Sequence, residues 1–498
     1  MRRAISIYVV PAAAIAIFAM LAGCEVGPDF EKPAAPKTDG YAAEPPAATA
    51  ATPGIAGGEA QRFQNGGDVA GAWWALFHSE ALNALIAEAL TNNPDLKAAQ
   101  AALSSARENV LAQRGAYWPG VSAGFSASRQ LQSGALAPVP DSNAFQYSLF
   151  TPEVSVSYVP DVFGLNRRTV ESLAAQQDAA RFQMLATYTT LTTNVAVTAI
   201  QQASTDAQIA AARALVDDSA KSLDILAYQR KKGYASDVDV AAQKSILAQA
   251  KALLPPLEKQ AAQLHDLLAT LTGHFPGEAS PQTITLTSLV LPQEIPLSLP
   301  SDLVAQRPDV QQAEANLHAA SAEIGIAVAN RLPNIELSAN AGSTALAINQ
   351  VFAAGTGFWT VGAGLTAPIF DGGALLHRER GARAAYDQAA QQYRSTVLAA
   401  FQNVADTLAA LQQDAEALKA AAAADDAAKR SRDLAGQQVK DGYSSALALF
   451  SAEQAYQQAE INLVQMQASR FADTAALYQA LGGGWWHKPE LTGDDHGA

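Results

Sequence analysis

The sequence predicts a mainly helical protein with a β-barrel contribution, built from one structural unit that occurs twice. The first observation is the duplication itself. Asn93-Pro94-Asp95 is matched by Arg307-Pro308-Asp309 at an offset of 214 residues, and Gly233-Tyr234 is matched by Gly442-Tyr443 at an offset of 209. The second is a pair of very long helical stretches, and the third is a set of four short alternating segments. A repeat of this length indicates one supersecondary unit used twice, in the order helix, two strands around a loop, long helix, Gly-Tyr turn, helix.

The N-terminus has the pattern of a secretion signal. Arg2 and Arg3 precede an almost uncharged apolar run over residues 4–20, which closes on Leu21-Ala22-Gly23-Cys24. A membrane-spanning helix is the alternative for this run, but the run is short for that purpose. Because Cys24 is the only cysteine, no intramolecular disulfide is possible.

Cys24 directly follows Leu-Ala-Gly and resembles the acylated cysteine of a bacterial lipobox. Acyl chains contribute about 0.8 kcal/mol per buried CH2, so a multiply acylated Cys24 is a firm membrane anchor. Glu25 follows it, whereas Asp is associated with retention in the inner membrane. The resemblance therefore implies sorting to the outer membrane.

Composition excludes some partners. Signal cleavage leaves 31 basic against 47 acidic residues, a net charge of −16, which is a poor match to nucleic acid. Residues 25–72 are rich in Pro, Ala and Gly, and we expect an extended tether there. No later stretch approaches 18 uninterrupted apolar residues, so we expect no further transmembrane helix.

Two proline-free stretches, residues 167–232 and 376–440, predict long helices. Unbroken, each reaches roughly 95 Å at 1.5 Å per residue, far beyond the average globular helix. Their many alanines favour close packing in a coiled-coil array. For such helices alone, a soluble stalk is the alternative interpretation.

Four short segments alternate apolar residues with small or polar ones. In the last of them, Trp359, Val361 and Leu365 alternate with small and hydroxyl residues. This pattern is typical of strands in a water-filled transmembrane barrel, although half-buried sheets of soluble proteins alternate too. Barrels need about eight strands or more and an open edge cannot face lipid, so several chains must contribute to one barrel. The predicted strands cover about 119–131, 146–160, 333–345 and 357–368.

The Gly-Tyr turns have the chemistry of helical hairpins. A lysine precedes each glycine, where a cation is favoured at a helix C-terminus, and glycine suits the left-handed C-cap conformation. A serine follows at the position that N-caps the returning helix. Docking of these tips to a periplasmic partner is a separate hypothesis. The tip residues are Gly233, Tyr234 and Ser236 in the first hairpin and Gly442, Tyr443 and Ser445 in the second.

Several motifs resemble those of TolC-type outer-membrane efflux factors, especially the lipid-anchored NodT-type branch that serves resistance-nodulation-division (RND) pumps. They are Trp73-Trp74-x-x-Phe77, Arg307-Pro308-Asp309-Val310 with Glu314, Pro368-Ile369-Phe370-Asp371-Gly372-Gly373, and residues 478–485. The resemblance implies a homotrimer whose twelve strands form one barrel and whose helices form a long periplasmic α-barrel. It also implies two protein partners, a periplasmic membrane-fusion adaptor and an inner-membrane RND transporter.

The resemblance implies a gate just after the second hairpin. Leu447 matches its apolar position, but Ser451 and Gln454 stand where the family has an acidic and a basic residue. Asp237 and Asp239 at the first hairpin are candidates for a replacement acidic ring. Their alternative role is to complement the helix dipole.

Enzyme motifs are absent from the sequence. It contains no His-Glu-x-x-His, no phosphate-binding Gly-x-x-x-x-Gly-Lys-Ser/Thr loop and no Gly-x-Ser-x-Gly. Residues 362–367 match a dinucleotide-binding pattern formally, but they lie in an alternating strand rather than before a helix. We therefore expect no enzyme, metal or cofactor.

The sequence thus predicts a passive outer-membrane export channel of an RND efflux pump. The exit duct of type I protein secretion is one alternative, and a periplasmic coiled-coil structural lipoprotein without a pore is another. The expected domains are a signal peptide (1–23), a lipid-anchored tether (24–72), a first repeat (73–273, tip about 230–237), a connector (274–301), a second repeat (302–484, tip about 439–446) and a tail (485–498).

Overall fold

The computed structural model describes residues 25–36, 38, 40, 41, 48–131, 146–278 and 284–492. Cys24, the signal sequence and most of the first loop between strands lie outside these residues. The chain divides into two compact units. Unit 1 comprises residues 1–32, 103–179 and 313–393, and unit 2 comprises residues 33–102, 180–312 and 394–498.

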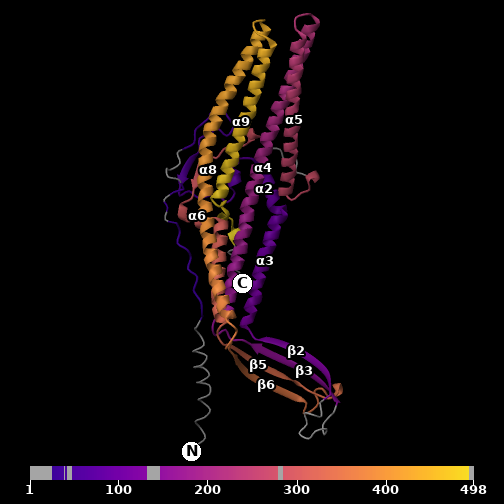
Figure 1. Cartoon of the computed structure of the whole chain (residues 1–498), viewed down its shortest axis with the longest axis vertical. Helices are drawn as coiled ribbons and strands as arrows, with labels where there is room; N and C mark the ends of the chain where they lie inside the picture. The colour runs from indigo at the N-terminus through magenta and orange to yellow at the C-terminus, as the bar shows by residue number, and fades with distance from the viewer. Residues whose placement is uncertain are drawn as a thin grey trace, which may run out of the picture. The chain divides into compact units, whose positions relative to one another are not determined.

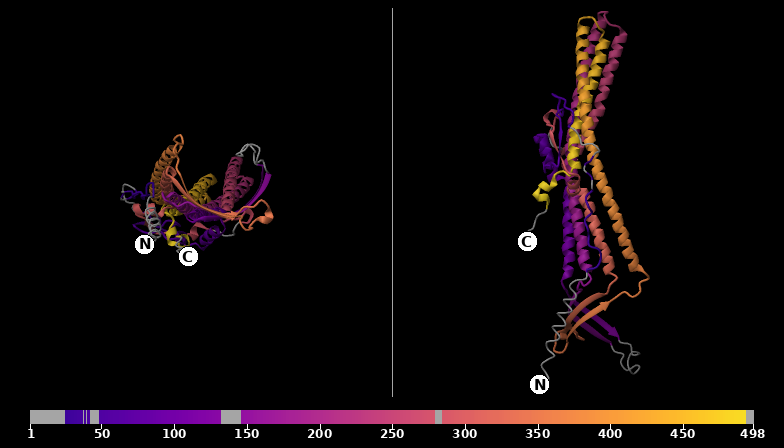
Figure 2. Two further views of the ribbon diagram at one scale, coloured as in Figure 1. Left: turned by 90° about the horizontal axis from the view of Figure 1, so that it is seen from below. Right: turned by 90° about the vertical axis from the view of Figure 1, so that its left-hand side faces the viewer.

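Unit 1 contains a four-stranded antiparallel sheet of order β2-β3-β5-β6. The strands lie side by side and curve together (Figures 1 and 2). Each repeat supplies one hairpin, and the central pair β3–β5 joins the repeats. The strands are β2 (Gly120–Leu131), β3 (Gln146–Tyr158), β5 (Asn334–Ser343) and β6 (Gly357–Thr366).

Equivalent helices of the two repeats have equal lengths. The two long helices have 67 residues each and the two returning helices 35 each. In unit 2 the returning helices α5 and α9 lie alongside α4 and α8 (Figure 1). The prediction of a mainly helical fold with some strands is confirmed. These helices are α3 (Pro94–Arg114), α4 (Leu165–Lys231), α5 (Asp237–Leu271), α7 (Pro308–Ala329), α8 (Ala374–Lys440) and α9 (Ala446–Ala480).

Aromatic residues from distant motifs form part of the core of unit 2. The Trp73 ring is fully buried and stacks on Tyr478 at a centroid distance of 5.4 Å. Trp485 donates its indole N–H to the Gln306 carbonyl at 2.7 Å. Arg307 donates to the Ala480 carbonyl at 3.1 Å. The shorter elements of this unit are β1 (Arg62–Asn65), η1 (Trp73–Phe77), α2 (Glu80–Asn92), β4 (Glu294–Leu297), α6 (Pro300–Gln306), η7 (Trp485–His487) and α10 (Pro489–Thr492).

The segment expected to be an extended tether is packed where it is described. Strand β1 pairs in parallel with β4, so that Phe63 lies opposite Ile295. Arg470 is fully buried and donates to the carbonyls of Gly57 and Glu59. The sequence did not predict these contacts. Within the described residues, no helix has a stretch that is both long and apolar enough to cross a bilayer.

Candidate functional site

The strand register brings most of the apolar positions of the sheet to one face; Tyr147, Leu149 and Phe358 lie on the other. Val121 lies opposite Val156, Val156 opposite Ala339, and Ala339 opposite Val361. Residues directly opposite each other in a sheet share a face, so this row crosses all four strands. Ile335 and Leu365 form a further apolar pair on the same face.

The other face is polar along the adjacent row. Ser122 lies opposite Ser155, Ser155 opposite Asn340, and Asn340 opposite Thr360. The alternation expected from the sequence is therefore in phase across the two repeats. A slip of a single residue would have mixed the two faces.

The described residues leave much of the apolar face uncovered. Trp359 is 77% exposed, Val361 72%, Leu365 70%, Val121 69% and Phe125 60%. Contiguous exposed apolar surface of this kind marks an interface with protein or membrane. Within the part of the chain that the structure describes, the edge strands β2 and β6 each have a partner on one side only.

The first helical tip has the cap chemistry that its sequence predicts. Gly233 adopts a left-handed φ of 79°. The Ser236 hydroxyl accepts from the Asp239 N–H at 3.1 Å, and the Asp239 carboxylate accepts from the Ser236 N–H at 2.9 Å. The Ser236 hydroxyl also donates to the Asp239 carboxylate at 2.7 Å. The hydrogen bonds that the carboxylate accepts, first from the backbone N–H and then from the hydroxyl of Ser236, lower the pKa of Asp239. Asp237 pairs with Arg230 at 2.5 Å.

The second tip is built in the same way, but the first turn of its returning helix α9 has no acidic residue. Gly442 also has a φ of 79°, and the Ser445 hydroxyl accepts from the Ala448 N–H at 3.4 Å. Tyr443 is 86% exposed and Tyr234 of the first tip is 85% exposed. Both tips thus present a tyrosine to the surroundings.

The two hairpins pack together next to their tips. Leu226 of α4, Val240 of α5 and Phe450 of α9 form one buried cluster. Beside it lies a cavity of about 390 Å³, whose lining includes Tyr234, Asp239, Ser445 and Leu447. The structure therefore brings four of the predicted tip and gate residues to one place.

The remaining gate candidates lie further along α9. Leu447 is 59% exposed, and its carbonyl accepts from the Ser451 hydroxyl at 3.1 Å. Gln454 lines a separate cavity of about 220 Å³ together with Glu453. Sequence reasoning did not find Phe450, although its place one turn after Ser445 in an apolar run is the signal for a buried contact.

A sheet with one apolar face, one polar face and two open edges, in the same chain as duplicated long helical hairpins, defines a TolC-like outer-membrane channel. The chain belongs to the outer membrane efflux protein family, whose sequence model matches residues 85–274 and 299–483.

Curated relatives agree with this assignment. The chain is 30% identical to the toluene efflux pump outer membrane protein TtgC of Pseudomonas putida, over 94% of each chain. It is also 30% identical to the pyoverdine export outer membrane protein OpmQ of Pseudomonas putida, over 83% of this chain and 88% of OpmQ.

Solved structures share the fold. The outer-membrane channel OprN superposes with a TM-score of 0.81 at 25% identity, covering 93% of this chain and 100% of OprN. The outer membrane protein VceC of Vibrio cholerae gives 0.76 at 25% identity, covering 83% and 98%. The protein is therefore an outer-membrane efflux protein and not an enzyme.

Proposed function

We propose that the protein is the passive outer-membrane channel of a tripartite efflux pump. In this proposal a homotrimer exports small molecules that an inner-membrane RND transporter delivers through a periplasmic adaptor. The two-faced sheet is the observation that carries the proposal. Its apolar face suits lipid and its polar face suits a water-filled lumen.

The open edges of the sheet support oligomerisation. An edge strand cannot face lipid, because its unpaired N–H and C=O groups have no water to bond. Three copies of the four-stranded sheet give twelve strands, which suffice to close a barrel. In such a barrel β6 of one copy pairs with β2 of the next.

The duplication predicts the register of that intermolecular pair. The pair Val121–Val156 of the first hairpin corresponds to Ile335–Leu365 of the second, at the same offsets of 214 and 209 that relate the two repeats. By the same equivalence, the pair Val156–Ala339 corresponds to Leu365 opposite Phe125 of the neighbouring copy. Both residues belong to the apolar face, so this register keeps the face continuous across the interface.

The helical tips form the periplasmic mouth and the adaptor-docking surface in this proposal. The exposed tyrosines and the cavity between the hairpins support that role. We assign the constriction to Leu447, with Ser451 and Gln454 behind it. The hydrogen bonds of Asp239 and the ion pair of Asp237 favour a capping role for these two acids over a free acidic ring.

The proposal also covers how the chain is attached to the outer membrane and where the loop between β5 and β6 lies. We propose that Cys24 is acylated after signal cleavage and anchors the chain in the outer membrane. The described loop over residues 344–356, between β5 and β6, would then lie outside the cell. The names of TtgC and OpmQ refer to toluene and pyoverdine, which supports small-molecule efflux over protein secretion.

Outer-membrane fractionation and single-channel recording test this proposal together. We expect a heat-modifiable oligomer in the outer-membrane fraction and discrete conductance steps in a planar bilayer. A deletion strain should become more sensitive to toxic small molecules. A monomeric, non-conducting protein would contradict the proposal and favour a structural coiled-coil lipoprotein.

A further inference from the structure

A buried arginine fastens the first described residues to unit 1. The Arg168 side chain is 4% exposed and lies among three carboxylates. It contacts Glu171 at 2.7 Å, Asp29 at 2.8 Å and Glu25 at 3.2 Å. Two of these acids belong to residues 25–32, which we call the N-terminal latch. A buried cation of this kind is stable only with such partners.

Backbone and ring contacts hold the latch in the same position. The Val26 N–H donates to the Phe163 carbonyl at 3.3 Å, and the Val26 carbonyl accepts from Arg168 Nε at 3.1 Å. The Phe30 ring stacks on His318 at a centroid distance of 4.3 Å. The latch is therefore attached at both of its ends.

Glycines allow an approach too close for any side chain. A Cβ on Gly27 would lie 2.4 Å from the Gly325 Cα, and Gly27 has a left-handed φ of 101°. A Cβ on Gly164 would lie 2.9 Å from Glu25 Cγ. Glu25, the first described residue, is therefore packed against the turn that precedes α4.

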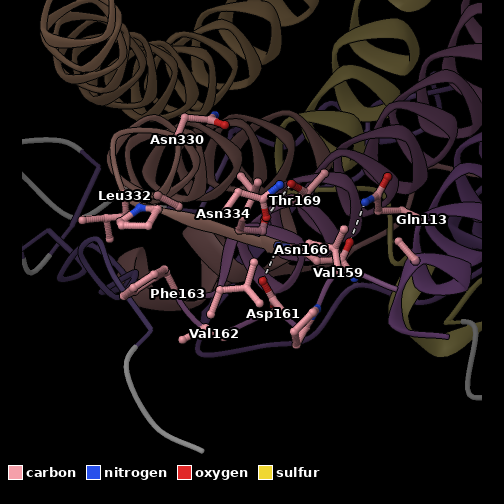
Figure 3. Close-up of a pocket in the computed structure, with 16 residues that line it drawn as sticks. Gln113, Val159, Asp161, Val162, Phe163, Asn166, Thr169, Asn330, Leu332 and Asn334 are labelled. Carbon is pink, nitrogen blue, oxygen red and sulfur yellow. Dashed lines mark hydrogen bonds between the residues drawn. The ribbon is translucent and has the colours of Figure 1, made fainter. Parts of the chain in front are cut away.

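A cavity of about 360 Å³ lies next to this attachment point. Its apolar lining comes mainly from the turn between β3 and α4 and from the turn between α7 and β5 (Figure 3), with one residue from the start of β5. Phe163, whose carbonyl binds the latch, is also part of this lining. The apolar residues include Val159, Val162, Phe163, Leu332 and Ile335.

The same cavity holds a polar group with no partner. Asn166 accepts from Gln113 Nε2 at 2.6 Å through its amide oxygen. Its amide nitrogen is buried and makes no hydrogen bond within the described residues. Buried donors normally have an acceptor, and the carbonyl of a fatty-acyl group is an acceptor that would enter with an apolar chain.

We propose that this cavity binds one of the acyl chains carried by Cys24 while the others insert into the outer membrane, and that the N-terminal latch places that one chain there. The proposal rests on the acylation of Cys24 proposed above. Cavities of about 300–1,000 Å³ with apolar walls and a few polar groups are typical ligand sites. Glu25 and Val26 contact Gly164 and Phe163 next to the cavity, so an acyl chain on the preceding residue would be tethered close to it, whereas a free phospholipid has no such tether.

Photo-crosslinking tests whether an acyl chain occupies the cavity. Cells are grown with a diazirine-bearing palmitate, and the purified full-length protein is irradiated and digested for mass spectrometry. We expect label on peptides that contain Val162, Phe163 or Leu332. Label confined to other regions or to bilayer lipid would overturn the proposal. So would unchanged labelling of a Cys24→Ser protein exported with a non-lipoprotein signal, because free phospholipid would then be the occupant.

Two variants test the latch and the cavity separately. Arg168→Met should lower labelling of the cavity peptides at least fivefold, while palmitate incorporation is unchanged. Val162→Trp adds bulk inside the cavity and leaves every latch residue unchanged, and it should also lower labelling of the cavity peptides. Arg383→Met, in the same unit and 58% exposed, is the matched control and should leave labelling unchanged.

Single-channel conductance, measured on the parent protein and on each variant, distinguishes failure of the acyl-site proposal from failure of the channel proposal. Normal channels with no label in the cavity would contradict the acyl site alone. Absence of palmitate from the protein would contradict both the site and the acylation on which it rests.

Discussion

Val156 of β3 lies directly opposite Ala339 of β5, and both residues belong to the apolar face of the sheet. This pair joins the two repeats. The two hairpins have equivalent registers. Since the β3–β5 pairing places the apolar residues of one hairpin opposite those of the other, the two hairpins share one continuous apolar face. The same geometry at the open edges leads to the barrel proposed for the assembled protein.

A charge on the apolar face should block assembly. Lys or Arg on the lipid face of a barrel costs about 2–4 kcal/mol at the bilayer midplane. We expect Val361→Arg to reduce the heat-modifiable oligomer strongly in outer-membrane fractions. Thr360→Arg, at the next position and on the polar face, is the control and should assemble. Equal assembly of the two variants would contradict the assignment of the faces.

The acidic residues at the first tip should affect stability more than ion selectivity. Asp239 completes the cap of α5 and Asp237 pairs with Arg230. Ser236→Ala removes the N-cap of α5 and should weaken the hairpin, and Asp239→Asn, which weakens the reciprocal hydrogen bond of the capping box, should act in the same direction. Local hydrogen exchange measures this loss.

Charge reversal at both positions tests the acidic ring directly. If Asp237 and Asp239 form a cation-selective ring, replacing both with Lys should lower cation preference in planar-bilayer recordings. Unchanged selectivity, together with the hairpin destabilisation, would leave the capping role as the explanation. Ser236→Ala is the control that alters the cap without altering charge.

Arg470 should be essential for the packing of residues 48–60. It donates to Gly57 at 2.8 Å, Glu59 at 2.9 Å, Leu411 at 3.0 Å and Thr49 at 2.7 Å. Arg470→Leu leaves these buried acceptors without a donor and should cost about 3 kcal/mol. Limited proteolysis should then cleave within residues 48–60. Arg430→Leu, at an exposed ion pair, should cost under about 0.5 kcal/mol, and equal effects would contradict the role of Arg470.

The pair Asp414 and Asp473 predicts a pH dependence of stability. Burial is the main cause that raises the pKa of Asp414 from 3.8 to about 7. A hydrogen bond with Asp473 and the negative charge of Asp473 raise it further, whereas the positive charge of Arg470 lowers it. The Asp414 carboxyl loses its proton at a lower pH in the unfolded chain than in the folded protein. The free energy of unfolding therefore falls as the pH rises from 3.8 to about 7. After solvent screening the loss is about 1 kcal/mol.

Asp414→Asn removes this titration. The variant should gain stability relative to the parent at about pH 8 and differ little at about pH 4, as measured by thermal unfolding in detergent. The isosteric amide keeps the volume of the site. A parent protein whose stability does not change between these two pH values would contradict the prediction.

Local chemistry made much of the fold predictable. The four observed strands lie within two residues of the alternating segments at each end, because a period of two residues is visible without knowledge of partners. The turn at Gly233 and the cap at Ser236 follow from neighbouring residues alone. The offsets of 214 and 209 account for the equivalent registers of the two hairpins, whereas the register of β3 against β5, which joins the repeats, came from the structure.

Long-range polar contacts were not predictable in this way. Arg470 reaches Gly57, which is 413 residues distant in sequence, and Arg168 reaches Asp29 across 139. Nothing in the neighbourhood of either arginine identifies its partner. Strands β1 and β4 have four residues each, too few for a periodic signal. The composition of residues 25–72 indicated a tether because these contacts depend on backbone carbonyls and glycines rather than on large apolar side chains.

Disulfide trapping at the edge strands tests the shared barrel most directly. A Phe125→Cys/Leu365→Cys protein, exported without the native Cys24 thiol, is oxidised in the outer membrane and run on a denaturing gel. The account predicts covalent oligomers up to a trimer for this pair, and far less for the one-residue slip Ser126→Cys/Leu365→Cys. Monomers only, or equal trapping of both pairs, would contradict it.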